Sequence, residues 1–88
     1  MHKKRRTELE ERFRCAFAAN LQEYRKRYEL SQAEMAKKLH ISVRSYNDLE
    51  HGISSPSATT LAHFMLMLEK EDQKAFLSFV KDTLEKEE

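Results

Sequence analysis

The sequence contains few of the residues that most often form turns. Among its 88 residues there is one glycine, Gly52, and one proline, Pro56. Strands joined by tight turns need more of both, whereas a compact helical domain does not. A single glycine also excludes a glycine-rich phosphate loop, and no Gly-x-Ser-x-Gly nucleophile motif is present. The composition therefore favours one small all-α domain and gives no support to an enzyme.

Cysteine is equally scarce. Cys15 stands alone, so no disulfide can form within the chain. We expect this thiol to be buried or half-buried in a helix, in a protein from a reducing compartment. Cys15 and the four histidines show no metal-ligand spacing, and nothing in the sequence indicates a metal, another cofactor or a small-molecule ligand.

Long apolar runs are missing as well. The longest, residues 64–68, is far shorter than the roughly 18 residues of a membrane span. The basic start of the chain leads into glutamates rather than into the apolar segment of a secretory signal. These observations predict a cytoplasmic protein without a membrane segment.

The net charge of +1 hides an uneven distribution. Residues 1–51 carry 12 Lys and Arg against 8 Asp and Glu, whereas residues 52–88 carry 4 against 7. The first part has a balance of +4 and is suited to face a polyanion, and the second part, at −3, is not.

Apolar residues recur with helical spacing in five segments. The first helix is expected from Thr7, where Thr7-x-x-Glu10 has the capping-box pattern, to about Tyr28. Serines at 31, 42 and 57 are suited to cap the next three helices, and a fifth should start at about Asp72. Gly52 is expected to end the third helix with a positive φ.

A set of positions in the second and third helices shares one register: Gln32-x-x-x-Ala36-x-x-Leu39-x-Ile41-Ser42-x-x-x-Tyr46-x-x-Leu49-Glu50-x-Gly52. This pattern resembles the helix-turn-helix of the Cro/repressor (XRE) family, and the similarity extends over more than half of the chain. The resemblance implies a lambda-repressor-like bundle of five helices, in which the helix at 43–51 enters the major groove of double-stranded DNA. It also implies a transcriptional regulator, with repression as the expected role.

The resemblance assigns roles to individual residues. Val43, Arg44 and Asp48 match positions that contact bases: valine suits a thymine methyl, arginine a guanine, and aspartate the amino group of cytosine. The residues expected at DNA phosphates are Gln32, Lys37, Ser45, Ser54 and Ser55. Plainer roles remain open, namely surface charge for Arg44, Asp48 and Lys37, and packing near the turn for Val43.

Arg25 and Glu50 fall where many family members have an ion pair that ties the first helix to the end of the third. Either a structural role or a contribution of Arg25 to a phosphate contact fits the sequence. His40 and Glu29 occupy positions where the family often has glycine, and a side chain adopts a positive φ there only at some cost in strain. The loop at 53–55 also lacks the basic residue that family members often carry.

The predicted organisation is a basic arm at 1–6, a DNA-binding domain at 7–70 and a carboxyl-terminal helix at 71–88. The arm, with Lys3, Lys4, Arg5 and Arg6, suits either DNA contact or a solubilising tail. The last helix either pairs two copies into a homodimer or only completes its own core. A protein-interaction module that retains the fold, such as an antitoxin or an adaptor, is the alternative function.

Overall fold

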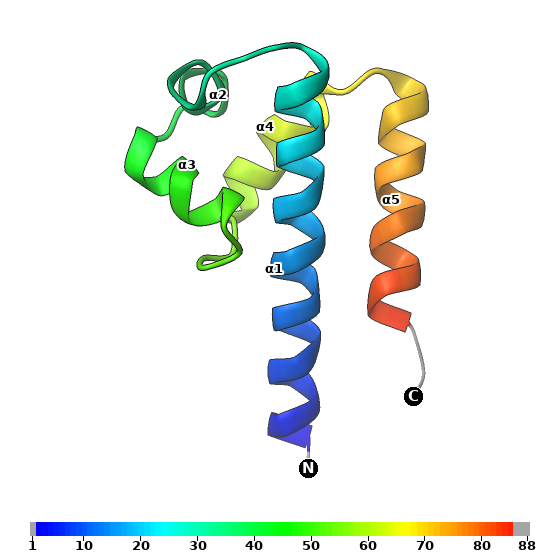
Figure 1. The fold of residues 1–88 in the computed structure, drawn as a ribbon. Coiled ribbons are helices and arrows are strands. Elements are labelled where there is room, and N and C mark those ends of the chain that lie inside the picture. Colours follow the sequence, from blue (N-terminus) through cyan, green and yellow to red (C-terminus); the bar gives the residue numbers. More distant parts are fainter. Residues whose placement is uncertain (1, 86–88) are drawn as a thin grey trace.

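The computed structural model describes the backbone of residues 2–85 and the side chains of residues 7–85. These residues form five α-helices and no strand, which confirms the predicted all-α class. The helices are α1 His2–Arg27, α2 Gln32–Leu39, α3 Val43–Glu50, α4 Ala58–Met67 and α5 Lys70–Glu85. Helix α5 runs antiparallel to α1, α2 and α3 lie on the other side of α1, and α4 lies behind it (Figure 1).

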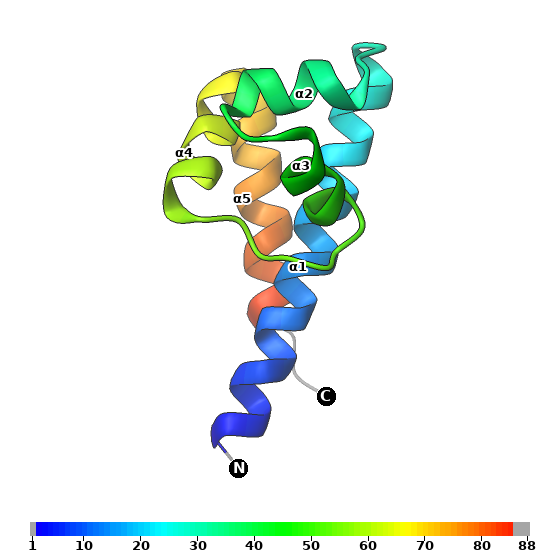
Figure 2. The same cartoon turned by 90° about the vertical axis from the view of Figure 1, so that its left-hand side faces the viewer.

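The start of α1 corrects the prediction from sequence. The helix begins at His2 rather than at a cap on Thr7, because residues 2–6 are mostly Lys and Arg, which are strong helix formers. At 1.5 Å per residue, its 26 residues span about 39 Å. Its first turns project past the neighbouring helices (Figure 2). The boundary expected between residues 6 and 7 therefore falls inside one helix, and the basic side chains of residues 3–6 lie outside the described side chains.

The predicted serine caps are confirmed. The side chains of Ser31, Ser42 and Ser57 accept hydrogen bonds from the backbone N–H three residues further on, at 3.0, 3.0 and 3.1 Å. At α2 the Glu34 carboxylate also accepts from the Ser31 N–H at 2.7 Å, which completes the capping box. Each cap satisfies a backbone donor that the helix itself leaves without a partner.

Helix α5 begins two residues before its predicted start. The amide of Gln73 donates to the carbonyls of Met65 and Leu68, at 2.8 and 3.3 Å, and so ties the first turn of α5 to the end of α4. Leu68 has extended backbone and ends α4.

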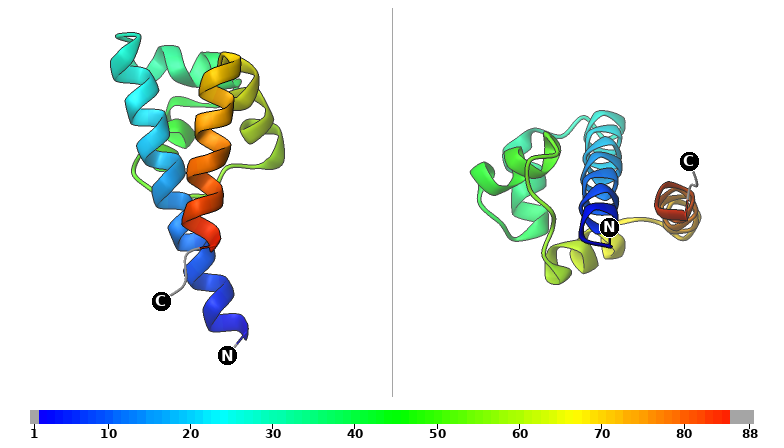
Figure 3. Two further views of the ribbon diagram at one scale, coloured as in Figure 1. Left: turned by 90° about the vertical axis from the view of Figure 1, so that its right-hand side faces the viewer. Right: turned by 90° about the horizontal axis from the view of Figure 1, so that it is seen from below.

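The core joins all five helices. Its centre is an aromatic cluster of Phe17, Phe64 and Phe76 from α1, α4 and α5, whose rings meet edge to face with centroids 5.3–6.2 Å apart. The other buried members are Leu21, Met35, Ala36, Leu39, Tyr46 and Leu49. The view from below in Figure 3 shows α1 in the middle, with α5 on one side and α2 and α3 on the other. Phe76 is only 4% exposed, so α5 does complete the core of its own chain.

Cys15 lies on α1 and is exposed, so the expectation of a buried or half-buried thiol was wrong. It stands two residues from both Phe13 and Phe17, which pack in the core. A helix turns about 200° over two residues, so a residue between two core positions faces away from the core.

Candidate nucleic-acid interface

Helices α2 and α3 are joined by residues 40–42 and cross steeply. Figure 1 views α2 along its axis and α3 from the side, and Figure 2 reverses the two views. Ala36 is buried, and its carbonyl accepts from the Ile41 N–H at 3.0 Å. The small side chain of Ala36 and this hydrogen bond hold α3 at a fixed angle to α2.

The turn uses a residue other than glycine in the left-handed region. His40 has φ 61° and ends α2, as the sequence led us to expect. Its ring packs against that of His63 from α4, with centroids 4.7 Å apart. This contact helps to hold a conformation that costs a residue with a Cβ atom about 1 kcal/mol or more. Glu29, with φ 54°, and Gly52, with φ 71°, are the other left-handed residues among those described.

Helix α3 has an inner and an outer face. Tyr46, Leu49 and Glu50 are buried. The first turn points outward: Val43 is 47% exposed, and Arg44 and Ser45 are exposed as well. An exposed valine next to an exposed arginine contributes little to the core, so this turn is available to a ligand.

Two polar residues of α3 lie less far outward than the sequence suggested. Asp48 and Asn47 are half-buried, and the Asn47 amide donates to Oε1 of Gln32 at 3.5 Å. The carbonyl of Asp48 accepts from the N–H of Ile53 at 2.9 Å. Asn47 therefore does not point outward, because its side chain turns back to α2.

A hollow of 270 Å³ lies beside α3. It is bordered by α3, the following loop and the start of α4, and its lining includes Ser45, Asp48, Ser54 and Ser55. The structure thus brings together four of the predicted DNA-contacting residues, two from α3 and two from the loop. Val43 and Arg44 lie on the exposed first turn of the same helix, and Lys37 is exposed on α2.

The Glu50 side chain, 3% exposed, is the centre of a polar network at the end of α3. Its carboxylate accepts from Arg25 Nε at 2.7 Å, from Gln32 Nε2 at 2.6 Å and from the Tyr46 hydroxyl at 3.2 Å. Arg25 also donates to the Leu30 carbonyl at 3.2 Å. Three helices, α1, α2 and α3, therefore meet at one buried carboxylate.

This network fixes the ionisation of Glu50. Burial alone raises the pKa of its carboxyl group, but the hydrogen bonds from Arg25 and Gln32, the charge of Arg25 and the Tyr46 hydroxyl outweigh burial, so the pKa lies below its usual value. Burial, followed by the charge of Glu50, raises the pKa of the Tyr46 hydroxyl. Glu50 is thus a carboxylate and Tyr46 a neutral donor at neutral pH.

We expect the free energy of unfolding to decrease at pH values under about 4.3, which is the pKa of glutamate in an unfolded chain. Because the pKa of Glu50 is lower in the folded chain, the unfolded chain takes up the proton first. The stabilisation by Glu50 is complete above the pKa of the unfolded chain. It is lost as the pH falls through the lower pKa that Glu50 has in the folded chain. Urea unfolding of the wild type and of Glu50→Gln between pH 3 and 7 measures it. The stability difference between the two proteins should shrink at acid pH, and a constant difference would contradict the assignment.

Three polar residues of this region were not singled out from the sequence. Gln22 donates to the Glu50 carbonyl at 2.7 Å, and Arg14 donates to the Gly52 carbonyl at 3.3 Å. Asn47 joins the same network through Gln32. A sequence signal does exist for Gln22, which precedes Arg25 by three positions and so lies on the same side of α1.

Gln32 is predicted to contact phosphate, but its amide is engaged inside the protein. It donates to Glu50 and accepts from Asn47, and the side chain is half-buried. Both polar atoms of the amide therefore bond to groups of the protein itself. The amide nitrogen carries two hydrogens, so the one that does not bond to Glu50 is left for a phosphate.

Other kinds of site find little support. Among the described residues, no three His, Cys, Asp or Glu side chains are grouped as metal ligands. None of the helices in the described part of the chain combines the length and the apolar character that crossing a membrane requires.

Comparison with known proteins gives one match. A family described as Helix-turn-helix matches residues 21–62, from the second half of α1 to the first half of α4. No curated protein and no solved structure matches the chain.

Proposed function

Residues 21–62 belong to the helix-turn-helix family of the Cro/repressor (XRE) type, a family of DNA-binding regulators, and from this premise we propose that the protein binds a specific sequence of double-stranded DNA. Helix α3 enters the major groove, which is about 12 Å wide and admits one helix. The observation that carries the proposal is the outward first turn of α3, with Val43, Arg44 and Ser45, within the matched segment.

Base recognition is proposed for three residues of α3. Arg44 donates two hydrogen bonds to O6 and N7 of a guanine, and Val43 packs on a thymine methyl. Asp48, which lines the hollow beside α3, accepts from a cytosine amino group. Such contacts distinguish sequences because each base pair presents its own pattern of groups in the major groove.

Phosphate contacts position the helix without selecting a sequence. Lys37 on α2 supplies a positive charge, and Ser45, Ser54 and Ser55 supply hydroxyl donors. The first turn of α2, with Gln32, offers backbone N–H groups and the positive end of the helix dipole. With few cations among these residues, we expect a modest salt dependence, since each phosphate that a lysine or arginine neutralises adds to the slope.

We further propose that the protein acts in the cytoplasm as a homodimeric repressor of transcription. A dimer places two α3 helices about one turn of DNA apart, ~34 Å, and so matches an inverted repeat. Repression needs only that the bound dimer occupy its site, and no second surface for an activating partner.

The proposal is tested by selecting binding sites from a randomised duplex pool. The salt concentration is held at about 0.1 M, because DNA affinity depends strongly on salt. Enrichment of a short inverted repeat is the expected result. A folded protein that enriches no sequence would contradict it and would favour the protein-interaction module, with the exposed Leu77 and Phe79 of α5 as the surface to test.

Gln32→Ala is expected to weaken binding to the selected site and to random duplex by similar factors, because a phosphate contact carries no sequence information. The same change removes a hydrogen bond to Glu50 and should raise the pKa of that carboxyl group. Fluorescence titration with both duplexes and NMR titration of the glutamates measure the two effects. A raised pKa with unchanged DNA affinity would leave Gln32 with a structural role only.

A further inference from the structure

The two sides of α3 differ in the charge that they offer to DNA. In Figure 2 α2 lies above α3, and the loop at 52–57 runs below it. A helix in the major groove has a phosphate backbone along each edge of the groove, so in the proposed complex α2 faces one strand and the loop faces the other. Helix α2 carries Lys37, whereas residues 52–57 include no Lys or Arg. A cation for the second strand has to come from another part of the chain.

Helix α1 passes directly beside this loop. Nε of Arg14 donates to the Gly52 carbonyl at 3.3 Å, a contact between residues 38 positions apart. Gly52 has φ 71°, and a side chain on it would begin 3.9 Å from the Arg14 carbonyl oxygen, so the backbones of the loop and of α1 are close. The N–H groups of Gly52 and Ile53 donate to the carbonyls of Leu49 and Asp48, which holds the loop against the end of α3. Arg14 therefore joins α1 to a loop that has no charge of its own.

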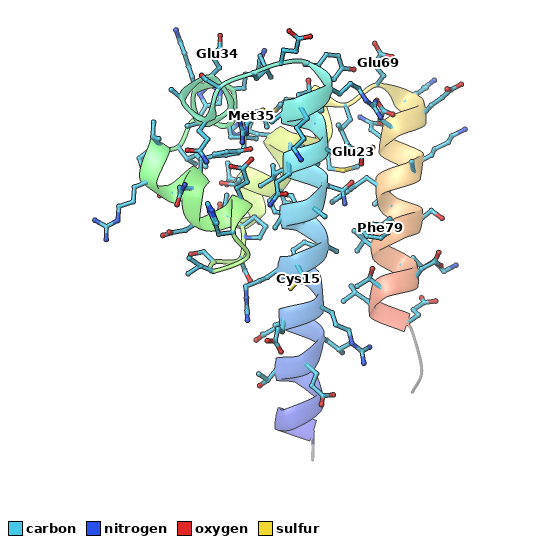
Figure 4. All side chains as sticks on the ribbon, in the orientation of Figure 1. Cys15, Glu23, Glu34, Met35, Glu69 and Phe79 are labelled. Atoms are coloured by element: carbon cyan, nitrogen blue, oxygen red, sulfur yellow. The ribbon has the colours of Figure 1, made fainter. Side chains whose placement is uncertain are left out.

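Arg14 lies on α1 near the point where the helix emerges from behind the loop. Figure 2 shows the loop crossing in front of α1 on the side that carries α3, with the first turns of α1 projecting below it. Cys15, the next residue of α1, lies near the level of the loop in Figure 4. The Arg14 side chain is half-buried, so part of it remains in water. A guanidinium bonded to the loop on this side can reach a ligand that the loop contacts.

The guanidinium of Arg14 keeps hydrogen-bond donors for such a ligand. The bond to Gly52 uses Nε, and the two terminal nitrogens carry further N–H groups. Glu10 and Glu11 precede Arg14 by about one turn, but no ion pair in the described part of the chain joins either of them to Arg14. Glu11 lines the hollow between α1 and α5, and Glu10 is exposed to water. The planar fork of an arginine suits two oxygens of one phosphate.

We propose that Arg14 binds a phosphate of the DNA strand beside the loop, and that the Gly52 carbonyl holds its guanidinium in place. The contact supplies the cation that residues 52–57 lack, while the hydroxyl groups of Ser54 and Ser55 donate to the same strand. Lys37 on α2 serves the other strand. This inference deepens the proposed function and rests on it, because it concerns how the same complex is held.

Arg12 provides a matched control on the same helix. It lines the hollow between α1 and α5 together with Phe79 and Thr83, and α5 lies on the side of α1 opposite to α3 (Figure 3). Two residues turn an α-helix by about 200°, so Arg12 and Arg14 face nearly opposite directions. Arg12→Gln and Arg14→Gln therefore remove the same charge from two sides of α1. Both side chains are only half-buried, so circular dichroism should show that the variants fold.

The salt dependence of DNA binding tests the contact. The full chain is titrated by fluorescence with the selected site and with random duplex, at salt concentrations between about 0.05 and 0.2 M. Arg14→Gln should weaken both complexes by about tenfold, because a charged hydrogen bond to DNA is lost. It should also reduce the slope of log K against log salt concentration by about one, because one phosphate is no longer neutralised. Arg12→Gln should leave the slope unchanged and the affinity within about twofold.

Arg14→Lys separates a phosphate contact from a purely structural role. Lysine keeps the positive charge but lacks the Nε–H group that bonds to Gly52. If Arg14 contacts a phosphate, the lysine variant should retain the slope and most of the affinity. If Arg14 only holds the loop, the lysine and glutamine variants should lose the same affinity with no change in slope. That second result would overturn the inference.

The outcomes separate this inference from the proposed function. A protein that selects a DNA sequence, but whose slope does not depend on Arg14, would overturn the phosphate contact and leave the function intact. A protein that binds every duplex equally, with a slope that Arg14→Gln reduces and Arg12→Gln does not, would support the contact and contradict sequence-specific binding. A folded protein that binds no duplex would overturn both.

Discussion

Glu50→Ala is expected to lower the free energy of unfolding by about 3–5 kcal/mol, the range for breaking one side of a buried ion pair. The carboxylate is 3% exposed and accepts from Arg25, Gln32 and Tyr46, so its removal leaves three donors without their acceptor. Arg25 keeps only 28% of its side-chain surface in water and cannot regain full hydration. Urea unfolding followed by circular dichroism at pH 7 measures the loss.

Glu23→Ala is the matched control. It removes a carboxylate from an exposed pair with Arg27, whose nearest N···O distance is 3.6 Å and whose side chains are 70% and 49% exposed. Such an exposed pair is screened by water and contributes little to stability. Equal losses for the two variants would mean that the Glu50 network costs as much in desolvation as it gains in hydrogen bonds.

Most of the fold follows from local features of the sequence. The first residues of α2, α3 and α4 could be predicted because a serine cap depends only on the backbone within three residues. The positive φ values of His40 and Gly52 likewise follow from where a helix has to stop. Local features alone did not predict the steep crossing of α2 and α3. That prediction depended on Ala36, which is buried and stands in the register of a known family.

Where prediction failed, competing interactions decided the result. Thr7 has the residues of a capping box, but the basic residues before it are equally good helix formers, so α1 extends to His2. The Gln32 amide has two possible acceptors, a phosphate outside and Glu50 inside, and sequence gives no measure of which is nearer. Exposure of Cys15 was predictable from the angular spacing of Phe13 and Phe17, and only its apolar neighbours argued otherwise.

The roles proposed for the DNA-contacting residues depend on the DNA as well as on the protein. The structure places Ser45, Asp48, Ser54 and Ser55 around one hollow and leaves Val43 and Arg44 outward. Position on a surface fixes which residues can reach a ligand. Which base each one selects depends on groups of the DNA, so it has to be measured on sequences that differ at one position.

Arg44→Ala is expected to remove the preference for one or two base pairs of the selected site, a loss of about 1–3 kcal/mol in discrimination, because a bidentate contact to guanine distinguishes it from the other bases. Arg44 is exposed, so the free energy of unfolding should be nearly unchanged. Competition titrations with the selected site, single-position variants of it and random duplex measure the preference.

Arg44→Lys provides the matched comparison, since lysine keeps the charge but lacks the planar fork that donates two parallel bonds. If Arg44 contacts a guanine, the lysine variant should retain affinity for random duplex and lose most of the discrimination at the same base pair. If Arg44 contacts a phosphate instead, lysine should restore binding to every duplex, and alanine should weaken all of them by similar factors. The second pattern would contradict base recognition by Arg44 and transfer the choice of sequence to Val43 and Asp48.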